Sequence, residues 1–302
     1  MSFSPAAWAI CAALLIGLFP VSSVRAGDAG SAHPSVWRIG SMEVISLQDR
    51  PAQMPASLFP GTDPALIKRY MPDGVAPATI SAFAVRQEGT VILVDAGYGL
   101  AGPGGSLLMK AMQEAGLTPE RIDLVLLTHM HGDHIAGLVA KGRRVFPRAK
   151  VLVSAPEAAF WLSGRPGKGQ VTNFRLAEEV RALYGEDFLP PFSFGTQVAP
   201  GITALDASGH TPGHTVFLLE SQGQKLLIAG DLIHAAALQF PDPSASPTYD
   251  LDPVKAAKTR RKYLAMAADE GIPLAGMHLP LPAMGRVRHD AETGFAFAPG
   301  TE

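Results

Sequence analysis

The chain has 302 residues, of which 47% are hydrophobic and 17% are charged, and its formal net charge is −2. This length fits one large domain or two small ones, and the apolar content excludes an intrinsically disordered protein. The near-neutral charge excludes a basic field of the kind that recruits nucleic acid. We therefore expect a globular protein with no nucleic-acid partner.

Residues 1–26 have the pattern of a cleavable signal peptide. Ala6–Phe19 is an apolar stretch that is short for a membrane span, and Val24 and Ala26 suit cleavage after Ala26. No Lys or Arg precedes this stretch, so an uncleaved anchor is the alternative. Cys11 is the only cysteine, so the mature chain would contain neither a disulfide nor Cys-ligated zinc. We expect an exported protein, periplasmic or secreted, with no stable membrane partner after cleavage.

Residues 27–78 are expected to form an N-terminal strand and a Pro-rich arm. Trp37–Asp49 alternates well enough to predict one strand. Pro51–Pro77 has no clean period, so we expect a long loop with a short helix around Ala65–Met71. Long irregular segments inside a domain often serve as lids or interface arms, and a plain surface loop is the alternative.

Residues 79–302 are expected to form the main domain, and its first half begins with a hairpin. The predicted elements, in chain order, are strands at Thr79–Arg86 and Thr90–Gly97, a helix at 106–115, a buried strand at Arg121–His129, a helix from about Asp133, a strand at Lys150–Ala155 and a helix at Ala155–Leu162. The residues QEG between the first two strands are a hairpin signal, and Gly116 closes the first helix.

The second half begins with one helix and then repeats the order of strands followed by a helix. The predicted elements are a helix at Phe174–Gly185, strands at Gly201–Ala207, Thr215–Ser221 and Gln224–Asp231, a helix at Asp252–Glu270 and a strand at Ile272–His278. Asp252 is the expected N-cap of the last helix, and Arg260–Lys262 is expected on its solvated face. Two such halves predict two mixed sheets stacked face to face with helices outside, an α/β fold of the αββα type.

The run Thr128–His134, THMHGDH, carries the strongest functional signal. It places four potential ligands, His129, His131, Asp133 and His134, within six positions. Burying such groups costs free energy unless each is paired. Two metal ions would offset that cost and supply a nucleophile at neutral pH, so the run predicts a metallohydrolase.

The spacing within this run fits two metals. His129 and His131 flank one residue of extended chain, so their side chains point to the same side. Gly132 leaves room for a turn, after which Asp133 and His134 begin a helix and aim elsewhere. Imidazole and carboxylate ligands suit Zn²⁺, with Mn²⁺, Co²⁺ or Fe²⁺ as alternatives.

This pattern resembles the HxHxDH motif of the metallo-β-lactamase superfamily, and later motifs follow in the order of that family. SGHTPGHT contains His214, AGDL contains Asp231, and AGMHLP contains His278. The resemblance implies the αββα metallo-β-lactamase fold and the following ligand roles. One metal is bound by His129, His131 and His214, the second by Asp133, His134 and His278, and Asp231 bridges the two.

Two further polar residues lie beside these motifs. Asp95 ends a predicted strand, and in this family such a residue orients a ligand from behind; the alternative is a cap of the DAGYG turn. His210 is outside the implied ligand set and is expected to be a hydrogen-bonded structural histidine.

Within the superfamily, FPRAKVLVSAPEAAFWLS and ALQFPDPS resemble methyl parathion hydrolase and its lactonase-like relatives. This resemblance implies a homodimer and an aromatic substrate pocket, in which Trp161 and Phe174 match pocket positions. A core position on a helix face is the alternative for Trp161. His234 replaces an apolar residue of the phosphotriesterase-type relative, and it is expected to hydrogen-bond a substrate oxygen.

We predict a hydrolase that attacks a small-molecule lactone or aryl ester with a metal-bridging hydroxide, while Asp133 passes the proton to the leaving group. The alternatives are an organophosphate triester hydrolase, a β-lactamase and a metal-binding protein without turnover. A glyoxalase II-like thioesterase and a flavodiiron-type oxidoreductase rank lower, because their additional segments have no counterpart in the chain.

Overall fold

The fold follows from strands that are apolar on both faces. The computed structural model describes residues 34–99, 106–165 and 170–300, so the predicted signal peptide lies outside the described residues. In strand β4 (Thr90–Val94), Val91 and Leu93 belong to one hydrophobic core, whereas Ile92 and Val94 belong to another. A sheet of such strands requires cover on both sides.

The first sheet has the strand order β1-β2-β3-β4-β5-β8. The bounds of its strands other than β4 are β1 Ser35–Ile39, β2 Met42–Pro55, β3 Val75–Gln87, β5 Leu124–Leu126 and β8 Lys150–Leu152. Neighbours from β1 to β4 pair antiparallel, and β5 pairs in parallel with both β4 and β8. The predicted hairpin around QEG is confirmed as the β3–β4 pair.

The second sheet has the strand order β15-β14-β13-β12-β11-β10-β9. Its strands are β9 Gln197–Ala199, β10 Ile202–Asp206, β11 Thr215–Ser221, β12 Gln224–Ile228, β13 Leu274–Ala275, β14 Met284–Asp290 and β15 Gly294–Pro299. The β12–β13 pair is parallel, and the other neighbours are antiparallel. The closing hairpin β14–β15 was not among the predicted elements.

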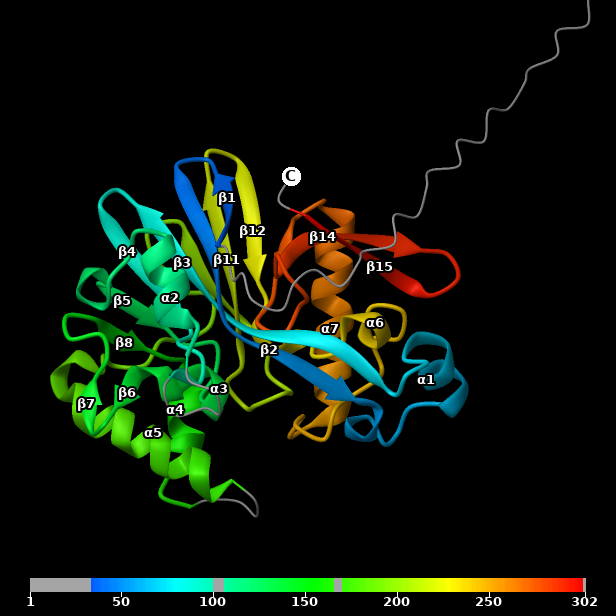
Figure 1. The fold of residues 1–302 in the computed structure, drawn as a ribbon, viewed down its shortest axis with the longest axis horizontal. Helices are drawn as coiled ribbons and strands as arrows, with labels where there is room; N and C mark the ends of the chain where they lie inside the picture. The colour runs from blue at the N-terminus through cyan, green and yellow to red at the C-terminus, as the bar shows by residue number, and fades with distance from the viewer. Residues whose placement is uncertain (1–33, 100–105, 166–169, 301–302) are drawn as a thin grey trace, which may run out of the picture. The chain divides into compact units, whose positions relative to one another are not determined.

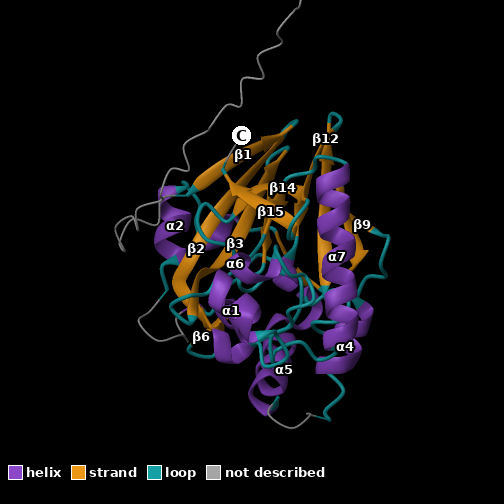
Figure 2. Cartoon of the chain, turned by 90° about the vertical axis from the view of Figure 1, so that its right-hand side faces the viewer, coloured by secondary structure: helices purple, strands orange, loops and turns teal. Residues whose placement is uncertain are grey.

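Helices cover the outer face of each sheet (Figures 1 and 2). Helices α2 (Leu108–Glu114), α4 (Ala155–Trp161) and α5 (Val171–Tyr184) share a core with the first sheet. Helix α7 (Pro253–Asp269) shares another core with the second sheet, and a third core fills the space between the sheets. The predicted αββα sandwich of mixed sheets is confirmed.

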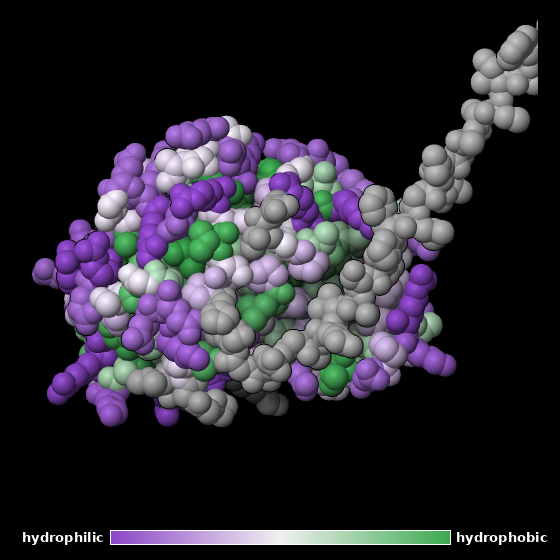
Figure 3. All heavy atoms as spheres, turned by 45° about the horizontal axis from the view of Figure 1, so that its top comes forward, coloured by the Kyte–Doolittle hydropathy of each residue, from purple (hydrophilic) through white to green (hydrophobic). Residues whose placement is uncertain are grey.

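Short elements complete the described part of the chain. They are α1 Pro64–Tyr70, α3 Gly132–Ile135, α6 Ala236–Gln239, the strands β6 Val139–Ala140 and β7 Arg143–Arg144, and the 3-10 turns η1 Ala56–Leu58, η3 Pro119–Arg121, η4 Ala136–Leu138, η5 Gly185–Asp187 and η6 Gly230–Leu232. Among the described helices, none combines the length and the apolar run that a membrane crossing requires. On the face shown in Figure 3, hydrophilic residues dominate the edges, with smaller hydrophobic groups between them.

The N-terminal arm differs from the prediction. Only the two ends of the expected loop are strand, since β2 continues to Pro55 and β3 begins at Val75, and these ends pair with each other. The residues between them contain η1 and α1. The expected single strand at Trp37–Asp49 is instead the hairpin β1–β2, which turns at Gly40. The short predicted helix is confirmed as α1. Residue 78 lies inside β3, so no break of secondary structure marks the predicted domain boundary.

The arm is held by its own small core. Met54, Phe59 and Met71 of the arm are buried together with Leu238 of α6. This core joins the arm to the loop that follows Asp231, and so places the arm beside the residues considered next.

Candidate metal site

The predicted ligands other than His214, together with His210, lie at or just after strand ends, whereas His214 directly precedes β11. His129 and His131 follow β5, His210 follows β10, Asp231 follows β12 and His278 follows β13. Asp133 and His134 lie in α3, which begins at Gly132 directly after His131. Because the segments come from both sheets, the ligands converge on one edge of the sandwich.

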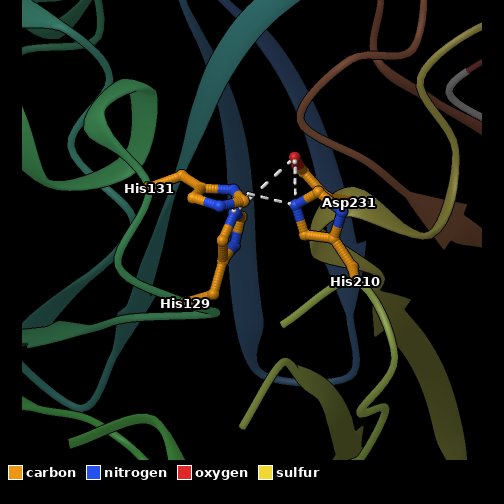
Figure 4. A group of neighbouring side chains, drawn as sticks. All are labelled: His129, His131, His210 and Asp231. Atoms are coloured by element: carbon orange, nitrogen blue, oxygen red, sulfur yellow. Dashed lines mark hydrogen bonds and ion pairs between the residues drawn. The ribbon is translucent and has the colours of Figure 1, made fainter. Parts of the chain in front are cut away.

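Four side chains form the first donor group: His129, His131, His210 and Asp231 (Figure 4). The His131 Nδ1 atom lies 3.0 Å from His129 Nε2 and 3.0 Å from His210 Nε2. The Asp231 Oδ2 atom lies 3.4 Å from His210 Nε2 and 3.7 Å from His129 Nε2. Three buried ring nitrogens that face one another cannot all be satisfied by hydrogen bonds among themselves, because a neutral imidazole has one donor and one acceptor nitrogen.

The second donor group shares Asp231 and adds Asp133, His134 and His278. The His278 Nε2 atom lies 3.1 Å from Asp231 Oδ2 and 3.4 Å from Asp133 Oδ2. The His134 Nε2 atom lies 3.2 Å from Asp231 Oδ1 and 3.7 Å from Asp133 Oδ1. Asp231 therefore occupies the position between the two groups that the resemblance implied.

Two atoms in these groups test whether a cation fits. His134 Nε2 and Asp231 Oδ1 are buried, and neither has a hydrogen-bond partner among the described residues. Unsatisfied buried polar atoms are costly, and their pairing at 3.2 Å lacks hydrogen-bond geometry. Ligand atoms about 2.0–2.1 Å from a tetrahedral cation lie about 3.3 Å from each other, so the spacing fits a shared ion. The residues could thus hold two divalent cations.

The outward ring nitrogens of the donor histidines are engaged by other groups. The His134 Nδ1 atom lies 2.7 Å from Asp95 Oδ2, as expected for Asp95, which has φ +59° and also accepts from the Thr128 N–H. His278 Nδ1 lies 2.8 Å from the Thr79 carbonyl oxygen. Such contacts fix the tautomer and direct the other ring nitrogen toward the metal position.

His214 requires a correction, because the structure places His210 in the first donor group instead. His214 Nε2 accepts a hydrogen bond from the Asp231 backbone N–H at 2.9 Å, and Nδ1 lies 3.2 Å from the Ala207 carbonyl oxygen. Both of its ring nitrogens are therefore used in holding the loop of Asp231. Gly230, at φ +55°, makes room for this ring, since a Cβ there would lie 2.5 Å from His214 Nε2.

Burial and neighbouring groups set the protonation of three site residues. Burial lowers the pKa of His129 and His131 well below the ordinary value, so both stay neutral, as metal ligands must be. Burial alone would raise the pKa of Asp231, but the surrounding histidines, His134 first, lower it well below its usual range. Asp231 is therefore a carboxylate at neutral pH.

A cavity of about 380 Å³ opens onto both donor groups. Its lining residues are Gln53, Met54, Ile80, Tyr98, His131, Gly132, Asp133, Gln170, Asn173, His210, Asp231, His234, Thr248, Tyr249 and His278. His234 lines this cavity as predicted, and Gln53 and Met54 come from the arm. Tyr98, Tyr249, Gln170 and Asn173 were not predicted, and no pattern in the sequence distinguishes them from other loop residues.

The two aromatic residues predicted for the pocket are not on its wall. Trp161 is fully buried, and its Nε1–H donates to Glu157 Oε1 at 2.5 Å behind His131. Phe174 is buried against Trp161, with ring centroids 4.9 Å apart. Both belong to the core between the first sheet and its helices, so the core alternative holds for Trp161.

Comparisons with known proteins agree with this geometry. The profile of the Metallo-beta-lactamase superfamily matches residues 76–271. Ribonuclease TTHA0252 of Thermus thermophilus is 29% identical over 200 residues, which cover 61% of this chain and 42% of the relative. The chain spans about half the length of the first curated relatives that it matches.

Two solved structures cover 89% of this chain and 98% of their own. One is the hydrolase AbOPH in the beta lactamase superfamily, with 29% identity and a TM-score of 0.79. The other is AidC, a dizinc quorum-quenching lactonase in complex with a product, with 26% identity and a TM-score of 0.81. The chain belongs to the metallo-β-lactamase superfamily. Among its described residues is a His/Asp cluster that could hold metal ions.

Proposed function

We propose that the protein is a metal-dependent hydrolase of a small lactone or aryl ester. It would use two divalent metal ions, for which zinc is the first candidate. The observation that carries this proposal is the pair of donor groups that share Asp231 on the wall of one cavity. The likeness to a dizinc lactonase supports the same substrate class. When bound, the two cations would activate water and polarise the carbonyl oxygen of the substrate.

The residues around the metal position would then bind the substrate and move its proton. Asp133 is partly exposed to the cavity, with 20% of its side chain accessible, and its Oδ2 lies 3.4 Å from His278 Nε2. A carboxylate there can take a proton from water and deliver it to the leaving oxygen. Burial, followed by the charge of Asp133, raises the pKa of Tyr98 to about 12, so this cavity residue stays a hydroxyl donor.

His234 is the residue that favours an oxygen-rich substrate. Its ring stacks on that of His278, with centroids 5.1 Å apart. The His234 Nε2 atom lies 3.1 Å from Asp231 Oδ2, but neither ring nitrogen makes a hydrogen bond of good geometry within the part of the chain described. Burial lowers the pKa of His234 to about 4, so the ring is neutral and retains one N–H donor. A lactone or ester oxygen would accept from it, whereas the polar ring narrows and polarises a cavity that a bulky apolar triester would have to fill.

A substrate panel tests the proposal. Turnover of dihydrocoumarin, an aryl acetate, an acyl-homoserine lactone, paraoxon, a phosphodiester and a cephalosporin is measured before and after treatment with a chelator, and again after Zn²⁺ is restored. We expect chelator-sensitive turnover of the lactones or the aryl acetate. The proposal would be overturned if the chelator abolished turnover of none of the lactones and not of the aryl acetate either, or if none of these substrates were hydrolysed.

The variant His234→Leu tests the specificity of the cavity. The ratio of lactone turnover to paraoxon turnover should fall in this variant relative to the wild type. The exposed residue His289 offers a matched control, His289→Leu, because neither it nor its hydrogen-bond partner Asp269 belongs to a donor group or lines the cavity. An unchanged ratio in His234→Leu would contradict the role given to this histidine.

We also propose export and a homodimer. The leader pattern of residues 1–26 supports export, and N-terminal sequencing of natively produced protein should begin near Gly27. The dimer is supported by the resemblance alone, and sedimentation at several concentrations tests it. An intact Met1, or a mass of one chain at all concentrations, would contradict these two proposals respectively.

A further inference from the structure

The helix residue Arg260 is buried behind the donor groups, although a solvated helix face was expected for it. It is 1% exposed, and its guanidinium donates hydrogen bonds in several directions. It donates to the carbonyl oxygen of Leu232 at 2.5 Å and to those of Pro243 and Ala245 at 2.9 and 3.1 Å. One side chain therefore holds the segment directly after Asp231 and the loop that follows α6.

The same guanidinium forms an ion pair with Asp250. The Arg260 Nη2 atom lies 3.1 Å from Asp250 Oδ2, and both side chains are buried. Asp250 Oδ1 in turn lies 2.9 Å from His210 Nδ1. A backbone contact joins the same two segments, because the Leu251 N–H donates to the His210 carbonyl oxygen at 3.0 Å. His210 is thus fixed through both its ring and its backbone.

We propose that Asp250 and Arg260 form a positioning pair that presents His210, rather than His214, as the third histidine donor of the first group. Asp250 accepts from His210 Nδ1–H, which directs Nε2 toward His131. Arg260 keeps Asp250 in place and holds Leu232 at the same time, so the positions of His210 and Asp231 are set together. The proposal rests on the proposed metal site, and it adds the two residues that position His210 in the first donor group.

Metal affinity is the readout that tests this role. The full chain is stripped of metal and titrated with Zn²⁺ in competition with a coloured chelator, for the wild type, Arg260→Met and Asp250→Asn. The control is Arg261→Met, because Arg261 is exposed on the same helix. We expect two sites in the wild type and the control. In Arg260→Met and Asp250→Asn, one site should weaken by about 10- to 100-fold while the other is retained.

A second measurement separates positioning from general stability. In ¹⁵N NMR spectra of the metal-free protein, His210 should carry its proton on Nδ1 in the wild type, and Asp250→Asn should alter this tautomer population. A loss of thermal stability with unchanged affinity at both sites would overturn the proposal, and so would variants that fail to fold even with Zn²⁺. A wild type that binds no metal would instead refute the proposed function, so the two failures are distinguishable.

Discussion

Glu157 accepts a hydrogen bond from the Thr211 hydroxyl at 2.7 Å, and this contact joins helix α4 to the loop of His210. The same carboxylate accepts from the backbone N–H groups of Met130 and Gly213 at 2.9 and 2.8 Å. Met130 lies between the two histidines of the HxH segment. A buried carboxylate therefore connects the two loops that supply all three histidines of the first donor group.

The variant Glu157→Gln should be less stable than the wild type. The carboxylate accepts four hydrogen bonds, the fourth from Trp161 Nε1, and an amide would turn an N–H₂ group toward some of these donors. Leaving buried donors unsatisfied costs about 1–3 kcal/mol, so the free energy of unfolding in urea should fall by about that amount. Glu178→Gln, at a partly exposed position of α5, is the control and should change little; equal stability of both variants would contradict the prediction.

The effect of Glu157→Gln should also depend on pH. Burial raises the pKa of Glu157 above its ordinary value of 4.5. Because the folded-state pKa is raised, this group contributes stability below its unfolded-state pKa, and that contribution is lost as the pH rises through the folded-state value. The stability deficit of the metal-free variant should therefore be larger at about pH 4 than at about pH 7. A deficit that grows toward neutral pH would have the wrong sign.

His210→Ala and His214→Ala should fail in different ways. His210→Ala removes a donor atom, so bound Zn²⁺ measured by mass spectrometry after dialysis should fall from two ions per chain toward one. His214→Ala removes two hydrogen bonds behind the site and should lower the free energy of unfolding by about 2 kcal/mol, with both ions retained. The reverse pattern would restore His214 as the ligand.

Metal removal should destabilise the protein. Bound cations would satisfy His134 Nε2 and Asp231 Oδ1, and they would bind the folded state alone. Zn²⁺ at about a thousandfold excess over its Kd should add about 4 kcal/mol to the free energy of unfolding. Calorimetry of the metal-free and Zn²⁺-loaded protein measures this, with Mg²⁺ as the control ion. Identical melting temperatures would show that the donor groups hold no metal.

The sequence predicted most of the donor set because the signal is local. Four costly side chains in THMHGDH, followed by Asp231 and His278 after apolar strands, left a metal site as the simplest reason for burying them. The layered fold was predicted for a similar reason, since runs such as VILV are apolar on both faces. For THMHGDH and for the apolar strands the decisive pattern lies within one segment, whereas Asp231 and His278 were assigned from the order of the family's motifs.

The predictions that were wrong concern features that depend on contacts with residues distant in the sequence. SGHTPGHT offers two histidines in one loop, and the selection depends on Asp250 and Ala207, which contact one ring each. An aromatic residue on a helix fits a core as well as a pocket wall, and Trp161 is drawn inward by Glu157. The arm was expected to be mostly loop because the Pro-rich stretch has no clean period, whereas pairing between β2 and β3 makes its two ends strand.

The contact between His278 and Thr79 joins positions that are 199 residues apart in the chain. The donor residues of the first group all precede residue 232, but the second group also needs His278 and the β3 strand that holds it. A ribosome thus releases almost the whole chain before the second group can assemble. Assembly of the second donor group therefore requires the C-terminal segment to return to β3.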